Sequence, residues 1–156
     1  MNNNAYLKYG PRFEDFEVGE TLRHAPGKTI TESDNNLFSL ITMNHHPVHI
    51  DQAYAEGEQH GKILVVGTLV FSLVVGLTVR DISAGAIANL SYEGIKHDAP
   101  VFIGDTLYAE TTILEKRASK SKNDRGLVKV ETRGLNQKGE TVITFKRQIL
   151  VKKSEG

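Results

Sequence analysis

The sequence contains no cysteine among its 156 residues. Disulfide scaffolds, thiolate metal sites, iron–sulfur clusters and cysteine nucleophiles are therefore excluded. An excess of charge is absent too, because 19 basic residues balance 19 acidic ones and the formal net charge is zero. Proteins that bind nucleic acid by neutralising phosphates usually carry a basic face, so this balance argues against that class. A local basic patch around an anionic ligand is still compatible with the composition.

Repeats, low-complexity tracts and internal linkers are missing as well. The length predicts one domain, with a flexible N-terminal segment over residues 1–12 and a folded domain over 13–156. The Asn-rich start lacks the apolar stretch of a signal peptide, so we expect a cytoplasmic protein.

A long uncharged run covers residues 63–79 and interrupts this otherwise mixed composition. It is shorter than the roughly 20 apolar residues that a membrane-spanning helix needs, and Gly67 and Gly76 lie inside it. A helix that is apolar on every side is sealed inside a protein when it does not face lipid. We therefore expect a central helix here, wrapped by a sheet.

The remaining pattern predicts an α+β fold. Thr31 and Asp34 form a capping-box pair ahead of a helix, and an apolar stripe of that helix follows at Leu37, Leu40 and Ile41. Pro47 ends helical continuation, and a short helical turn is expected over 52–56. After residue 85 the period changes to two, which predicts antiparallel strands over 86–93, 106–116, 127–135 and 141–151, with a bulge at Gly94.

Three of the six histidines lie within residues 45–49, which makes this the chemically densest segment. His45, His46 and His49, with Asp51, could supply metal ligands, but adjacent histidines diverge in most loops. His45 and His46 are more simply explained as turn residues that satisfy backbone groups. The third interpretation is acid–base catalysis by His49, since imidazole both takes and returns a proton near neutral pH.

Several segments share a pattern with one enzyme family. Pro47, His49 and Asp51 match the end of the motif Gly-Asp-x-Asn-Pro-x-His-x-Asp, and Gly67 follows His49 by 18 residues. The segment 100–107 is similar to a Pro-Val-x-x-Gly-Asp-x-Leu turn. Together these segments resemble the MaoC-like dehydratases, the (R)-specific enoyl-CoA hydratase family, over most of the chain.

The resemblance implies a hotdog fold, in which an antiparallel sheet wraps one long helix, and a reaction that adds water reversibly to an enoyl-CoA. His49 would be the proton-transfer residue and Gly67 the oxyanion donor at the start of the central helix. The flanking Val66 and Thr68 would bind substrate. No metal and no cofactor beyond the CoA thioester is implied, and the chain is expected to form a homodimer or higher homo-oligomer.

The chain departs from the family at Asn44, which replaces the catalytic Asp, and at Met43, which replaces the preceding Gly. An amide can position a water but cannot take its proton. This variant resembles a branch that includes hydratases of short dicarboxylic acyl-CoA thioesters, such as mesaconyl-CoA. Asp51 and Glu58 are the nearest carboxylates in sequence, although Asp51 is more readily explained as a helix N-cap.

Two other functions stay open. A hotdog thioesterase usually carries a carboxylate on or beside the central helix, and the absence of Asp and Glu from residues 67–79 counts against it. A non-catalytic acyl-CoA binding protein would explain the loss of the Asp at Asn44.

Overall fold

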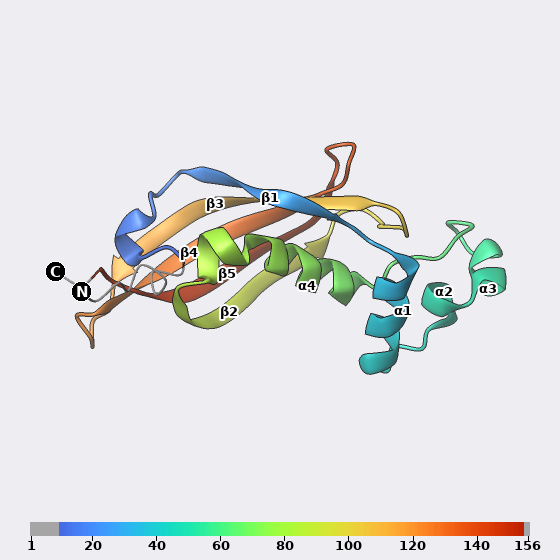
Figure 1. Cartoon of the computed structure of the whole chain (residues 1–156), viewed down its shortest axis with the longest axis horizontal. Helices are drawn as coiled ribbons and strands as arrows, with labels where there is room; N and C mark the ends of the chain where they lie inside the picture. The colour runs from blue at the N-terminus through green and yellow to red at the C-terminus, as the bar shows by residue number, and fades with distance from the viewer. Residues whose placement is uncertain (1–9, 155–156) are drawn as a thin grey trace, which may run out of the picture.

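The computed structural model describes residues 10–154, in which one antiparallel sheet curls around a central helix, α4 (Figure 1). The sheet has five strands in the order β1-β3-β4-β5-β2. The strands are β1 Thr21–Thr29, β2 Ala86–His97, β3 Thr106–Ala118, β4 Arg125–Leu135 and β5 Thr141–Lys152. The expected hotdog fold is confirmed, as is the expected bulge at Gly94, where the register of β2 and β5 shifts and Gly94 has φ 59°.

Three short helices lie together beyond the N-terminal end of α4 (Figure 1). The helices of the chain are α1 Glu32–Ile41, α2 Pro47–Ile50, α3 Gln52–Glu56 and α4 Gly67–Thr78, with a 3₁₀ turn η2 Phe13–Asp15 and a π-turn η3 Val79–Ser83. Thr31 caps α1 in the expected capping box with Asp34. Pro47, expected only to stop a helix, is also the first residue of α2, where its missing N–H costs nothing.

The central helix is covered by the sheet on one side only. Val70, Val74 and Thr78 are buried, whereas Thr68, Ser72 and Gly76 are exposed. The expected central helix with a sheet around it is confirmed, and in the single chain one of its faces, where small residues recur at a spacing of four, is open. Within residues 10–154, none of the helices is long and apolar enough to cross a membrane.

Helix α1 has the expected position but the opposite orientation to the one its apolar stripe suggests. Leu37, Leu40 and Ile41 are 61%, 60% and 69% exposed, whereas Asn35 and Ser39 are fully buried. The apolar stripe of α1 is therefore largely exposed, with Leu37 and Ile41 at the edge of a groove against α4, and the polar side of α1 is buried in the protein.

The C-terminal end of α4 holds a buried polar network. The His24 ring is hydrogen-bonded through Nδ1 to Asp81 Oδ2 and through Nε2 to Thr111 Oγ1, both at 2.8 Å. Thr111 Oγ1 in turn lies 2.9 Å from Thr132 Oγ1. Burial alone would raise the pKa of Asp81, but hydrogen bonds from His24 and Arg80 hold it below its ordinary value. This network ties β1 and β3 to the turn that follows α4.

Arg147 is a charged side chain inside the core at the same end. It is 1% exposed, and its Nη2 donates to Thr78 Oγ1 at 3.0 Å. Its Nε and Nη1 have no hydrogen-bond partner within the part of the chain that the structure describes. Burial lowers the pKa of Arg147, an effect that Tyr92 on the neighbouring strand opposes.

Candidate functional site

His49 lies on α2, and its ring is held by a backbone carbonyl. Nδ1 is 2.7 Å from the oxygen of Leu64. A carbonyl oxygen only accepts, so in the neutral ring the proton sits on Nδ1 and Nε2 carries the free lone pair. Among residues 10–154, no hydrogen bond occupies Nε2, and the residue is half-buried. His49 is therefore oriented as a proton acceptor.

Asn35 joins the His49 helix to the start of α4. Its Nδ2 donates to the carbonyl oxygen of His49 at 2.9 Å, and its Oδ1 accepts the N–H of Val66 at 3.0 Å. The side chain is fully buried, so both bonds are sheltered from water. Sequence reasoning missed Asn35. Its only signal is the polar pair formed with Ser39 opposite the apolar stripe of α1.

Gly67 begins α4, and the space a side chain would fill there is occupied by a histidine. A Cβ at this position would lie 2.9 Å from both Cε1 and Nε2 of His97, the last residue of β2. The sequence suggests two reasons for the glycine, approach of a ligand and packing of helix against sheet, and the packing role is supported. Nothing in the local sequence pattern pointed to His97, because 30 residues separate it from Gly67.

The residues on either side of Gly67 differ in exposure and in hydrogen bonding. Val66 is 1% exposed and its N–H is engaged by Asn35, so it supports the turn rather than offering a free group. Thr68 is exposed in the first turn of α4. The first N–H groups of a helix lack partners within it and favour negative charge nearby. Substrate contact by Thr68 stays a prediction.

The loop before His49 is shaped by its own side chains. Asn44 Oδ1 accepts the N–H of His46 over a long 3.4 Å, and His46 Nδ1 accepts the N–H of Val48 at 3.2 Å. The structural interpretation of His46 is therefore supported. Met43 has φ 57°, a left-handed conformation that favours glycine. This explains why a glycine suits the motif at that position.

The carboxylates near the site have other partners. Asp51 Oδ1 accepts the N–H of Tyr54 at 3.0 Å, which confirms Asp51 as the N-cap of α3. Glu58 accepts from the Tyr54 hydroxyl and so raises the pKa of Tyr54. Hydrogen bonds from Lys96 and Thr144 lower the pKa of Asp98, next to His97. In the described residues, no three His, Cys, Asp or Glu side chains are grouped as a metal site.

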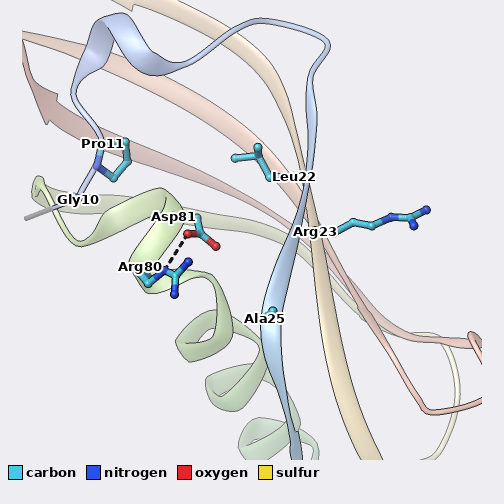
Figure 2. Close-up of a pocket in the computed structure, with 7 residues that line it drawn as sticks. All are labelled: Gly10, Pro11, Leu22, Arg23, Ala25, Arg80 and Asp81. Carbon is cyan, nitrogen blue, oxygen red and sulfur yellow. Dashed lines mark hydrogen bonds and ion pairs between the residues drawn. The ribbon is translucent and has the colours of Figure 1, made fainter.

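Two hollows flank α4 at opposite ends. An apolar groove of about 170 Å³ lies between α1 and α4, lined by residues that include Ile30, Phe38, Leu69 and Leu73. A second, more open hollow of about 500 Å³ lies beside the turn after α4, where Arg80 pairs with Asp81 (Figure 2). The groove lies along the N-terminal half of α4, at Leu69 and Leu73, whereas the open hollow lies at the far end of the helix.

Comparisons with known proteins agree with this architecture. A family model described as a MaoC like domain matches residues 14–134. The mesaconyl-CoA hydratase of Cereibacter sphaeroides is 37% identical over 155 residues, which cover 99% of this chain and 44% of that protein. The (R)-specific enoyl-CoA hydratase of Rhodospirillum rubrum is 34% identical over 102 residues, which cover 65% of this chain and 68% of that one.

A solved structure of a MaoC domain protein has the same fold as this chain. A MaoC domain protein dehydratase from Chloroflexus aurantiacus superposes with a TM-score of 0.89 at 36% identity, covering 94% of this chain and 41% of that one. The chain spans less than half the length of this protein and of the mesaconyl-CoA hydratase.

Proposed function

Because the chain belongs to the MaoC-like domain family, we propose that it is an enoyl-CoA hydratase that adds water reversibly across the α,β double bond. The observation that carries this proposal is the orientation of His49. The Leu64 carbonyl fixes its Nδ1, so that Nε2 is available as a base, and Asn35 ties the backbone of His49 to Val66 at the start of α4.

The mechanism follows from these positions. His49 Nε2 removes a proton from water as the water oxygen bonds to Cβ, and the π electrons move to form an enolate at the thioester oxygen. The N–H of Gly67 and the positive end of the α4 dipole stabilise that oxygen. Protonation of Cα completes the addition. The reaction transfers only a water molecule, so it needs no cofactor.

Asn44 has a supporting role in this scheme. Its amide can hold the attacking water or the loop that carries His49, and it cannot remove a proton. Its bond to the His46 N–H is long, so the amide retains capacity for a further hydrogen bond.

We propose a short acyl group, branched or dicarboxylic, as the substrate. The groove beside Leu69 and Leu73 has a volume of about 170 Å³, well below the roughly 300–1,000 Å³ of sites that take drug-sized ligands. The similarity to a mesaconyl-CoA hydratase points to the same size of substrate.

We further propose that the chain works as a homodimer. The edge strand β2 exposes Leu90 and Ile95 to 49% and 46%, and α4 has an open face at Thr68, Ser72 and Gly76. Exposed apolar edges of this kind are normally covered by pairing. Light scattering of the purified chain should give twice the mass of 17.3 kDa, and a monomer would contradict this part of the proposal.

The activity is tested by following enoyl absorbance with crotonyl-CoA and mesaconyl-CoA while free thiol is measured in parallel. We expect absorbance to fall without release of thiol, and His49→Ala to abolish the change. His45→Ala, an exposed histidine four residues away, is the matched control and should retain activity.

Other outcomes identify the alternatives. Release of free CoA would indicate a thioesterase. Binding of both substrates without turnover would indicate a non-catalytic acyl-CoA binding protein. A faster rate in Asn44→Asp would show that the missing carboxylate limits turnover.

A further inference from the structure

The hydration reaction needs two proton transfers, and His49 is positioned for the first of them, as the base that acts on water. A proton leaves water on the Cβ side, and another must reach Cα. Families that carry Asp at the position of Asn44 have a second ionisable group there, and an amide cannot replace it. Asp51, Glu58 and Asp98 are each held by other partners. The site therefore lacks an obvious second acid.

His97 is the titratable side chain in contact with Gly67. Its ring atoms Cε1 and Nε2 reach within 2.9 Å of the place where a Gly67 Cβ would stand. A substrate oxygen that accepts from the Gly67 N–H lies about 3 Å from that nitrogen, and Cα is two bonds from this oxygen. The imidazole of His97 therefore lies against the residue whose N–H would hold the thioester oxygen, and that oxygen is two bonds from the carbon that receives the second proton.

The surroundings of His97 leave its ring available. Its neighbours Lys96 and Asp98 pair with each other at 2.6 Å, and Asp98 also accepts from Thr144 at 2.7 Å. Within residues 10–154, no hydrogen bond is made by the His97 ring. The residue is exposed, so the ring can exchange protons with solvent between turnovers.

We propose that His97 is a second catalytic residue of this site, which donates the proton to Cα in hydration and removes it in dehydration. One proton passes from water to His49 and one from protonated His97 to Cα, so the enoyl thioester gains one water. Solvent then takes the proton from His49 and returns one to His97. This inference rests on the proposed hydratase function.

The test compares three variants with the unmodified chain on the preferred enoyl-CoA. We expect His97→Ala to lower kcat about 100-fold or more with KM within about threefold, as the loss of an acid–base group does. Added imidazole should restore part of the rate in His97→Ala. His97→Phe keeps a ring against Gly67 but cannot transfer a proton, so it should stay inactive and should not respond to imidazole. His60→Ala is the matched control on an exposed loop.

The outcomes distinguish an acid–base role of His97 from a role in packing against Gly67. Recovery of activity in His97→Phe would overturn the inference, because a packing role would then suffice. Activity of His97→Ala within about threefold of the unmodified chain would overturn it too. Failure of imidazole to restore any rate in a His97→Ala protein with unchanged melting temperature would also count against it. Absence of hydration by the unmodified chain would instead overturn the proposed function itself.

Discussion

The two ends of α4 each hold a histidine whose Nδ1 is hydrogen-bonded, yet the two residues have different capacities. At the C-terminal end, His24 has Asp81 on one nitrogen and the hydroxyl of Thr111 on the other. This order of groups reproduces the Asp-His-Ser arrangement of a hydrolase triad. At the N-terminal end, His49 has only a backbone carbonyl on Nδ1.

Access decides which of the two can act. Thr111 is fully buried and its hydroxyl is also bonded to Thr132, so no substrate can reach it. His24 is 4% exposed and both of its ring nitrogens are used. Within the described part of the chain, His49 keeps a free ring nitrogen, and Asn35 links the His49 backbone to Val66, the N-cap of α4. Hydrogen-bond order alone therefore does not identify a candidate catalytic histidine, because a free ring nitrogen with an open approach is needed as well.

The strongest test of this contrast is replacement of His49. We expect His49→Gln to lower kcat by about 10²–10⁴-fold, since it removes a general base, while the melting temperature changes little because the ring is only half-buried. Steady-state kinetics and thermal unfolding measured on the same sample check both parts. A large fall in melting temperature would mean that His49 is structural, like His24.

The reverse pattern is expected at the other end of the helix. His24→Leu removes two hydrogen bonds, so that, among the described residues, Asp81 keeps only Arg80 and Thr111 keeps only Thr132 as side-chain partners. We expect the free energy of unfolding to fall by about 2–4 kcal/mol, with kcat per folded molecule unchanged. Urea unfolding measures the free energy change, and kinetics at temperatures below the unfolding transition measure kcat. A loss of kcat without loss of stability would contradict the structural role of His24.

Arg147 offers a second test of whether the C-terminal end of α4 is purely structural. Its charge is buried without a carboxylate, so Arg147→Met should raise the free energy of unfolding by about 1 kcal/mol, because an apolar side chain of similar length replaces an unpaired charge. Chemical denaturation measures the change. Destabilisation instead would show that the hydrogen bond from Arg147 to Thr78 outweighs the cost of burying the charge.

The smallest effect is expected when acid protonates Asp34 in α1. Hydrogen bonds from Lys28 and from Thr31 lower the pKa of Asp34 from 3.8 to about 2. A lowered carboxyl pKa stabilises the fold above pH 3.8, and this contribution is lost as the pH falls towards 2. Solvent screens the partly exposed pair, so we expect about 1 kcal/mol or less. Asp34→Asn should remove that part of the acid sensitivity in pH-dependent unfolding.

Local patterns in the sequence determined much of the molecule. The capping box at Thr31, the period of two after residue 85 and the bulge at Gly94 predict their elements because each depends on residues a few positions apart. The match of Pro47, His49 and Gly67 to the motif of the MaoC-like family likewise implies the candidate loop and the start of the central helix.

Only the tertiary structure decided which faces and partners those elements have. The apolar stripe of α1 turns outward because Asn35, on its polar side, bridges His49 and Val66. His97 meets Gly67 and Arg147 meets Thr78 only when β2 and β5 fold against α4. These contacts join residues 30 and 69 positions apart, and they depend on strand register and helix placement, which short-range periodicity does not encode.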